Sequence, residues 1–521
     1  MKNEHKLSVI LQGAMILSVA SLISKILSAI YRVPFQNLVG NVGFYVFQQV
    51  YPIYGIGMVL ALSGLPMIIS RLIAEQEDKN RQKALLRQII VILLIIGIVS
   101  FIFLQLEAVH IAGFMGDVNL TGLVRAVSWM FLMMPFLASM RGYFQATLEM
   151  RPTAYSQVVE QIVRVAIIIA VAYLGTRWSW SAYTIGKYAM LAAPVAEIFS
   201  IAILIKYYWR DVKTLPRLKV VTYGKLWHQL WFQGGTICLL SSLMVLMQLI
   251  DSFTVRKGLL LSGMSFIQSQ SVKGVYDRGQ PLVQLGLVIA TSFASAILPS
   301  LSMAYKEKKK ASFRDLSSEM LRVSMFMTAG VATGMISLMP FINRLLFNSS
   351  QQNLTLCVFM LSVVLTTLIT IYSSILQSAN HFKITIISIM VGVLVKLLIT
   401  QPLVVYLKIM GASVSTVISL AVMLLLEVCL SPRAIVYVEQ KFSFGAKLVS
   451  MSIIMLVTEL ILSRAMMHLH IMHSLRMYSI VELMVLVPIG ILVFVGLAFK
   501  WNLLSDTEWK SVPVINKYLN K

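Results

Sequence analysis

The sequence predicts an all-α membrane protein with two repeated halves, and three observations support this prediction. The 521 residues are 58% hydrophobic and only 12% charged, and the mean hydropathy is +0.82. Apolar runs follow one another from residue 8 to residue 499, and the gaps are mostly too short for a folded extramembrane domain. A stretch of the first half also reappears, without gaps, 232 residues later.

The apolar runs have the length of transmembrane helices. One crossing needs about 20 apolar residues, and more when the helix is tilted. Strands of a membrane barrel are much shorter, so helices are the spanning structure that fits. We expect about fourteen spans, near residues 8–30, 44–70, 88–106, 122–143, 155–175, 183–205, 229–252, 280–303, 321–343, 353–378, 384–406, 411–430, 447–467 and 479–499.

The repeated stretch is residues 141–164, and its counterpart is residues 373–396. An even number of expected spans separates the two copies, which therefore run in the same direction and form a parallel duplication. We expect an N-terminal lobe of six spans at 1–225 and a C-terminal lobe of six at 226–440. A last helix pair and a tail follow at 441–521. The aligned pairs include Gln145 with Gln377, Ser156 with Ser388, and Arg164 with Lys396.

The net charge is strongly positive, with 44 Lys and Arg against 21 Asp and Glu. In a soluble protein this excess would indicate nucleic acid, but here it gathers in the segments that follow alternate spans. These segments are 79–87, 206–225, 306–314 and 500–521. By the positive-inside rule both termini are expected in the cytoplasm, with the basic segments against anionic membrane lipids. No nucleic-acid motif is present among them.

Four polar side chains share one face of the span that follows Pro152. Gln157, Glu160, Gln161 and Arg164 recur at i, i+3, i+4 and i+7. Ionisable residues inside a span usually face a bundle interior or a watery cavity and mark a pathway. The alternative is that Glu160 and Arg164, at i and i+4, only neutralise each other.

Further charged residues lie in the first span. Lys25 lies well inside it and Arg32 near its outer end, seven residues later and therefore on the same face. Arg32 is also in a position from which it could reach the membrane interface. In the second span, Gln48 and Gln49 lie in the outer half of a helix that its glycines and prolines are expected to bend.

Polar residues also flank the loop between the seventh and eighth spans. Asp251 ends the seventh span, and Asp277, Arg278 and Gln280 open the eighth. Asp277 and Arg278 form either an interfacial pair or part of a site.

If the cations of the spans meet in one interior, they make a site for an anion, with phosphate the obvious candidate. These cations are Lys25, Arg32, Arg164, Arg278 and Lys396.

No sequence motif indicates an enzyme or a bound cofactor. A P-loop, a nucleotide fingerprint, a nucleophile elbow and a zinc-protease helix are all missing from the sequence. His468, His470 and His473 lack the spacing of a known metal site, so we expect a solvated loop and no metal. Any pumping would draw on the membrane potential or on a Na⁺ or H⁺ gradient.

The chain resembles the polysaccharide-transporter branch of the multidrug/oligosaccharidyl-lipid/polysaccharide exporter superfamily. The resemblance covers essentially the whole chain and is carried by the runs RGYFQATLEMRPTAYSQVVEQIVR, SKILSAIYRVPF, QQVYPIYGIGMVLALSGLP and VYDRGQP. The chain is most similar to the Gram-positive group that holds stage V sporulation protein B-like proteins and lipid II flippase (MurJ-like) proteins.

This resemblance implies a MATE-like fold, in which two six-helix lobes face each other across a V-shaped cavity. Two more C-terminal helices would form a groove for a polyprenyl tail. Members move undecaprenyl-diphosphate-linked sugars to the outer leaflet by alternating access, which breaks no bond and is not an enzyme reaction. The cavity cations of the family match Lys25, Arg32 and Arg278, and Lys25 is a lysine where many relatives have arginine. Cell-wall synthesis proteins are possible partners.

Two other functions are compatible with such a chain. A drug or cation antiporter of the same superfamily would favour acidic cavity residues and twelve spans. A non-transporting scaffold for envelope synthesis would not need polar residues buried in spans. Among flippase substrates, lipid II is preferred over capsule-type or teichoic-type units.

Overall fold

The computed structural model describes residues 2–211, 220–432, 442–467 and 475–511, and every regular element among them is helical. The His468–His473 tract and part of the basic segments lie outside the described residues. The described chain forms two compact units, Met1–Asp277 and Arg278–Lys521. The lobe limits near residues 225 and 440 stay predictions.

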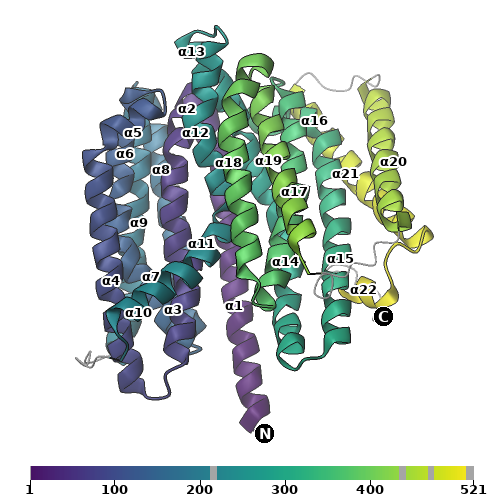
Figure 1. The fold of residues 1–521 in the computed structure, drawn as a ribbon. Helices are drawn as coiled ribbons and strands as arrows, with labels where there is room; N and C mark the ends of the chain where they lie inside the picture. The colour runs from purple at the N-terminus through teal and green to yellow at the C-terminus, as the bar shows by residue number, and fades with distance from the viewer. Residues whose placement is uncertain (1, 212–219, 433–441, 468–474, 512–521) are drawn as a thin grey trace. The chain divides into compact units, whose positions relative to one another are not determined.

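The first unit contains the helices of the expected N-terminal lobe and the bent helix that follows it (Figure 1). Its elements are α1 Lys2–Ile30, α2 Arg32–Val59, η1 Leu60–Gly64, α3 Leu65–Ala74, α4 Lys79–Leu106, α5 Ala108–Phe114, η2 Val118–Leu120, α6 Thr121–Ser128, α7 Met130–Ala146, α8 Met150–Arg177, α9 Ala182–Asp211, α10 Tyr223–Gln229, η3 Leu230–Gly234, α11 Gly235–Ser241, α12 Leu243–Leu261 and α13 Phe266–Asp277.

The second unit begins with the predicted eighth span. Its elements are α14 Gly279–Lys306, α15 Lys310–Ser337, α16 Met339–Phe347, α17 Asn353–Ser378, α18 Phe382–Leu407, α19 Met410–Leu430, α20 Phe442–Met467, α21 Leu475–Lys500 and α22 Asp506–Ser511.

The described residues contain 11 helical stretches long and apolar enough to cross a membrane, or up to 12 if one bent pair counts as a span. That pair, Tyr223–Ser241 and Leu243–Leu261, is bent by 73°. The stretch Met15–Ala74 is counted once although its 60 residues are about three times the length of one crossing. The all-α membrane class is confirmed, whereas the count of fourteen stays a prediction.

The long stretch Met15–Ala74 is interrupted at places where the sequence permits it. The helix stops at Tyr31, and Gly40 has a φ of 69° and a ψ of −175°, a conformation that glycine adopts without steric penalty. Farther on, residues 60–64 form a π-helix just before Pro66. The breaks at Tyr31 and Gly40 separate the spans predicted near 8–30 and 44–70, and the π-helix lies within the second of these spans.

The duplication predicted from sequence is present in the helix limits. α7 ends at Ala146 and α8 begins at Met150, and the limits of α17 and α18, Ser378 and Phe382, lie 232 residues after them. The sequence repeat is therefore a repeat of a helical hairpin.

The turns of the two hairpins also match in their backbone conformation. Leu148 and Asn380, which the alignment pairs, both have a φ of 61°. In the first turn the N–H of Glu149 donates to the carbonyl five residues earlier at 2.9 Å, and in the second the N–H of His381 does the same at 2.8 Å. Such 6→1 bonds around a left-handed residue end a helix in the Schellman manner.

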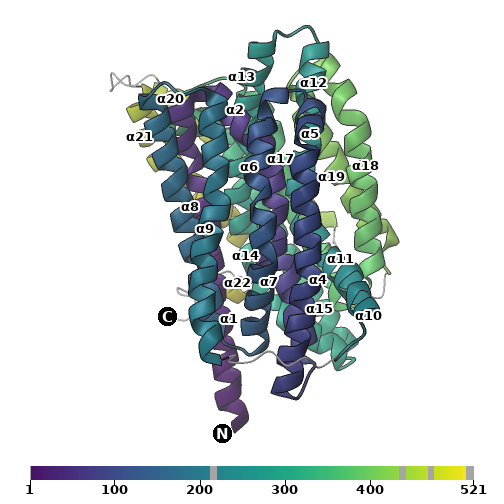
Figure 2. The same ribbon diagram turned by 90° about the vertical axis from the view of Figure 1, so that its left-hand side faces the viewer.

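Helices of the first unit pack through small residues and aromatic clusters. α8 packs against both α1 and α9 (Figure 2), and α3 packs against α7. Gly142 of α7 makes the latter approach close, because an added Cβ would lie 2.5 Å from a methyl group of Ile69. This contact sets the position of the preceding residue, Arg141.

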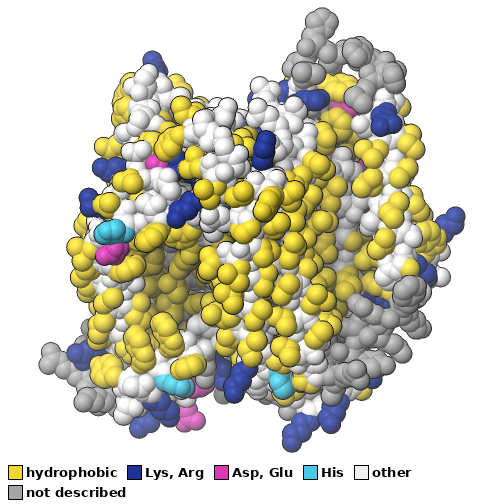
Figure 3. All heavy atoms as spheres, turned by 45° about the horizontal axis from the view of Figure 1, so that its top comes forward, with side chains coloured by type: hydrophobic (Ala, Val, Ile, Leu, Met, Phe, Trp, Pro, Cys, Tyr) yellow, Lys and Arg dark blue, Asp and Glu magenta, His cyan; other side chains and the backbone are white. Residues whose placement is uncertain are grey.

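On the face shown in Figure 3, apolar side chains cover much of the surface, and Lys and Arg side chains are scattered mostly around its edges. Leu398 of α18 and Leu492 of α21 are 64% and 72% exposed. Exposed aliphatic side chains along whole helices are typical of a surface that faces lipid, since large apolar patches are rare on soluble proteins. The chain is a multi-pass membrane protein.

Candidate functional site

A fully buried arginine on α7, Arg141, is the centre of a polar network in the first unit. Arg141 Nη2 donates to Glu160 Oε2 of α8 at 2.7 Å and to Ser200 Oγ of α9 at 2.9 Å. Its Nε donates to Ser156 Oγ at 3.1 Å. The side chain therefore joins three helices of the first unit through charge-assisted hydrogen bonds, which are about twice as strong as neutral ones.

The fourth contact of Arg141 is explained by the π-helix. Nη1 donates to the carbonyl of Ala61 at 3.3 Å. In π-helical geometry that carbonyl would accept from the residue five positions later, but this residue is Pro66, which has no N–H. Arg141 thus supplies the donor that Pro66 cannot supply to the Ala61 carbonyl. Inside a membrane each backbone carbonyl needs such a partner within the protein.

Glu160 does not form an ion pair with Arg164, the residue that follows it at i+4. The ion-pair partner of Glu160 is Arg141, on the preceding helix. Arg164 Nη2 instead donates to Gln161 Oε1 at 2.5 Å and to Ser28 Oγ of α1 at 3.2 Å. The four polar residues of α8 are all buried, as their common face predicted.

Arg164 and Arg32 share a cluster of tyrosines. The guanidinium carbon of Arg164 lies 5.3 Å from the ring centre of Tyr31 and 4.6 Å from that of Tyr54. The guanidinium carbon of Arg32 lies 4.2 Å from the ring centre of Tyr51, which itself packs against Tyr54 at 5.2 Å. Cation–π contacts with these rings hold both guanidinium groups in place.

Both arginines are only 2% exposed, and neither forms an ion pair with a carboxylate of the described residues. The interfacial alternative for Arg32 does not hold, because its side chain is buried against Tyr51 rather than extended to the helix end. Two of the five expected cations are therefore brought together.

Two further site candidates, Lys25 of α1 and Gln157 of α8, each lie seven residues before one of these arginines in the sequence. Lys25 is exposed on α1, and Gln157 accepts a hydrogen bond from Ser21 Oγ of α1 at 3.2 Å. α1 thus contacts the polar face of α8 through Ser21 as well as through Ser28.

The polar residues of α2 and α12 differ in what they contact. Gln49 Nε2 donates to the carbonyls of Met115 at 3.1 Å and Ser252 at 2.5 Å, so its amide nitrogen is bound by the backbone of the first unit. Asp251 Oδ2 accepts from the hydroxyl of Tyr276 at 3.0 Å. Gln48 is 2% exposed, and neither of its amide atoms has a hydrogen-bond partner in the described part of the chain.

The residues before the eighth span are paired differently from what their order in the sequence indicated. Asp277 forms its ion pair with Lys273, one helical turn earlier, at 2.9 Å. Arg278 is the first residue of the second unit and directly precedes α14. Its Nη1 donates to Asn343 Oδ1 at 3.3 Å, and its guanidinium carbon lies 5.2 Å from the ring centre of Phe347. Gln280 is buried one residue into α14.

Lys396 is fully buried in the middle of α18. Its Nζ donates to Thr416 Oγ1 of α19 at 2.5 Å. Arg164, its counterpart in the repeat, donates to a serine of α1 instead. Both copies of the repeat therefore bury a cation at the same position but satisfy it through different helices.

Several buried ionisable residues were not among the sequence candidates. Besides Arg141, they include four glutamates inside helices, each at most 2% exposed: Glu197, Glu427, Glu459 and Glu482. Ser373 Oγ donates to Glu427 Oε1 at 2.5 Å, and Ser337 donates to Glu459. A charged residue inside an apolar run was the available signal.

Comparisons with known proteins agree with the helical architecture. Residues 10–305 match the family described as "Polysaccharide biosynthesis protein". The chain is 38% identical over 410 residues to "Uncharacterized membrane protein YabM" of Bacillus subtilis (strain 168), covering 78% of this chain and 76% of that protein. It is 25% identical over 436 residues to "Lipid II flippase MurJ" of the same organism, covering 78% and 80%.

A solved structure has the same fold. "Lipid II flippase MurJ, inward closed conformation" superposes with a TM-score of 0.67 at 15% identity, covering 94% of this chain and 99% of that chain. The match to the family model extends over more than half of the 521 residues, and the likeness to the two relatives spans most of each chain. The chain therefore belongs to the polysaccharide biosynthesis protein family, in the MurJ-like group that the sequence resemblance predicted.

Proposed function

We propose that this protein is a flippase that moves an undecaprenyl-diphosphate-linked oligosaccharide across the bacterial cytoplasmic membrane. The observation that carries the proposal is the pair of buried arginines, Arg32 and Arg164, which share a tyrosine cluster and form no ion pair with the described residues, inside a multi-pass chain of this family. The relative named a lipid II flippase supports the same function. Lipid II or a closely related precursor is the substrate we favour over capsule-type or teichoic-type units.

The chemistry of the cargo explains why such arginines are needed. A diphosphate does not enter hydrocarbon unaided, because an unpaired charge in a low-dielectric medium is strongly unfavourable. Guanidinium groups held by aromatic rings keep their positive charge and their donors for oxygen atoms, and arginine binds such oxygens in a bidentate manner. The polyprenyl tail needs no shelter and stays in the lipid.

The remaining cations are assigned to the same task. We infer that Lys25, Arg278 and Lys396 also contact the diphosphate at some stage of the cycle. Parallel repeats that rock about the midplane would expose a central cavity to each leaflet in turn. Such alternating access moves the lipid without breaking a bond, in line with relatives that are flippases rather than enzymes.

The proposal includes the orientation of the chain in the membrane and the energy source of transport. The positive-inside rule places both termini in the cytoplasm. The chain has no nucleotide-binding motif, so coupling to the membrane potential or to a Na⁺ or H⁺ gradient would drive the cycle. Its partners would be the lipid-linked substrate, the surrounding lipids and the cell-wall synthesis proteins that supply or consume that substrate.

The test is to deplete the protein in its host and to follow radiolabelled lipid-linked precursors. Their accessibility to an enzyme added outside intact spheroplasts reports which leaflet they occupy. We expect one precursor to accumulate and to become inaccessible from outside, which also names the substrate. If every precursor stays accessible while the cells become sensitive to cationic drugs, the protein is an antiporter.

A further inference from the structure

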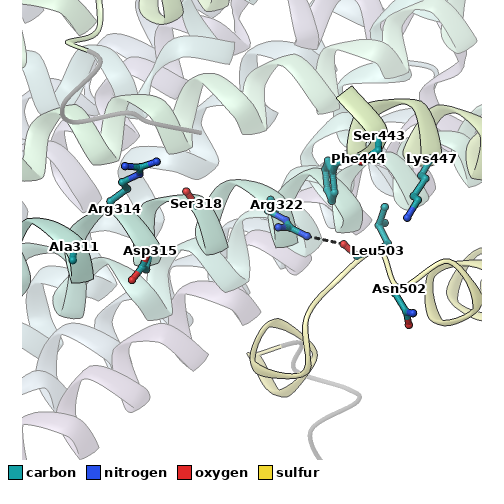
Figure 4. Close-up of a pocket in the computed structure, with 10 residues that line it drawn as sticks. All are labelled: Ala311, Arg314, Asp315, Ser318, Arg322, Ser443, Phe444, Lys447, Asn502 and Leu503. Atoms are coloured by element: carbon teal, nitrogen blue, oxygen red, sulfur yellow. Dashed lines mark hydrogen bonds between the residues drawn. The ribbon is translucent and has the colours of Figure 1, made fainter. Parts of the chain in front are cut away.

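A cavity of about 620 Å³ lies within the Arg278–Lys521 unit and is lined by none of the residues discussed above. α15 contributes Arg314, Asp315 and Arg322, α20 contributes Phe444 and Lys447, and Leu503 lies in the segment after α21 (Figure 4). The volume is within the range of small-molecule sites. Three basic side chains around one cavity point to an anionic ligand.

Two of the three cations are held in position by the segment after α21. Arg322 Nη2 donates to the carbonyl of Leu503 at 2.8 Å, and its guanidinium carbon lies 5.0 Å from the ring centre of Phe444. Lys447 Nζ donates to the carbonyl of Trp501 at 2.8 Å. An ammonium has three donors and a guanidinium five, so neither cation is saturated by these contacts.

The charge of the site matches a singly charged ligand. Asp315 is a carboxylate of the cavity wall, and Glu508 Oε1 lies 3.2 Å from Arg322 Nε. Three cations against these two carboxylates leave one net positive charge. A phosphodiester carries one negative charge, so it neutralises the site, whereas a dicarboxylate or a free diphosphate exceeds it.

The position of the cavity favours a lipid over a soluble anion. It lies at the N-terminal end of α15, directly after the basic link Lys308–Lys310, which the positive-inside rule assigns to the cytoplasmic side. Ile454 and Ile461 follow Lys447 at spacings of seven residues, share its side of α20 and are 38% and 63% exposed. A lipid whose head group lies at Lys447 could therefore place its hydrocarbon chains along this apolar face of α20.

We propose that this cavity binds the phosphate of an anionic lipid of the cytoplasmic leaflet. Basic pockets between transmembrane helices on this side are suited to phosphate head groups. The phosphate contacts Lys447 and Arg322, and Arg314 contributes charge at the mouth. The single net charge favours a bulk phospholipid as the ligand. The lipid-linked substrate also has a phosphate ester and a long apolar chain, but its diphosphate carries more charge, so it is the competing source of the phosphate.

The experiment is native mass spectrometry of the full chain in mild detergent, titrated with phosphatidylglycerol. We expect the double variant R314Q/K447Q to bind the first phosphatidylglycerol about tenfold more weakly than the unaltered protein, the effect of losing about 1.4 kcal/mol. The matched control R177Q/K383Q removes the same two charges at exposed positions and is expected to bind as the unaltered protein does. Thermal melting of both variants shows whether they are folded.

Three further titrations identify the source of the phosphate. Undecaprenyl diphosphate that displaces phosphatidylglycerol from the unaltered protein would name the substrate as the ligand, and failure to displace it names the bulk lipid. Inorganic phosphate that competes as well as either lipid overturns the proposal, as does equal binding of both variants or of zwitterionic phosphatidylethanolamine. Transport plays no part in this measurement, so it stands or fails independently of the flippase function.

Discussion

Arg141 and Glu160 form an ion pair at 2.7 Å between side chains that are 0% and 4% exposed. The pair joins the end of α7 to the middle of α8, so charge is balanced across a helical hairpin rather than along one helix. Its counterparts in the repeat are Ser373 and Gly392, neither of which is charged. Of the two repeated hairpins, only the N-terminal one is therefore joined by an ion pair at these positions.

Removal of either partner is expected to destabilise the protein strongly. Arg141→Leu leaves Glu160 buried without a cation, a change that costs about 3–5 kcal/mol for a buried pair. Glu160→Leu leaves Arg141 in the same situation, and the double variant is expected to be more stable than either single one. Melting temperatures of the four proteins in detergent give this double-mutant cycle. Additive losses in the double variant would show that the pair is not coupled.

The sequence predicted the hairpin better than it predicted the partner of Glu160. The 232-residue offset gives the limits of both hairpins, because turn residues and apolar runs repeat together. The spacing of i and i+4 pointed to Arg164 as the partner of Glu160. Helix pairs at this spacing contribute only about 0.2–0.5 kcal/mol, so the spacing is a weak guide to the partner. Arg141 is separated from Glu160 by a turn, and only the close packing of α3, α7 and α8 brings them together.

The same spacing rule would have been correct for Asp277. Its partner Lys273 is the residue at i−4, whereas the side chain of the adjacent Arg278 contacts Asn343 instead. Consecutive helical residues do not face each other, and residues four apart do. What sequence could not supply is the set of tertiary partners of Arg32, Arg164 and Lys396, because tyrosine rings and hydroxyl groups are too common to indicate a contact.

The charge of Arg164 is expected to be needed for transport. Arg164→Gln removes the cation from the tyrosine cluster, so the precursor assay should show loss of flipping while the protein still reaches the membrane. Arg164→Lys keeps the charge but lacks the planar group that stacks on Tyr54, and we expect partial activity. Arg177→Gln, at the exposed end of the same helix, is the control. Full activity of Arg164→Gln would remove this residue from the site.

A methyl group at Gly274 is expected to push α13 away from α2. An added Cβ would lie 2.1 Å from the backbone carbonyl oxygen of Asn41, and backbone cannot rotate away as a side chain can. Overpacking of this kind costs about 1–3 kcal/mol, so Gly274→Ala should lower the melting temperature. Gly496→Ala is the matched control, because no atom lies within 4 Å of its added Cβ and alanine favours a helix. Equal melting temperatures of the two variants would contradict the close contact.

The paired turn residues Leu148 and Asn380 offer a test of the repeat itself. Both have a φ of 61°, a left-handed conformation that costs a side chain such as leucine about 1–2 kcal/mol and that asparagine tolerates better. Leu148→Asn is therefore expected to raise the melting temperature, and Asn380→Leu to lower it by a similar amount. If the two turns are equivalent, the variant that carries both exchanges should melt near the unaltered protein. Opposite shifts of unequal size would show that the surroundings of one turn, rather than its backbone conformation, decide which residue it accepts.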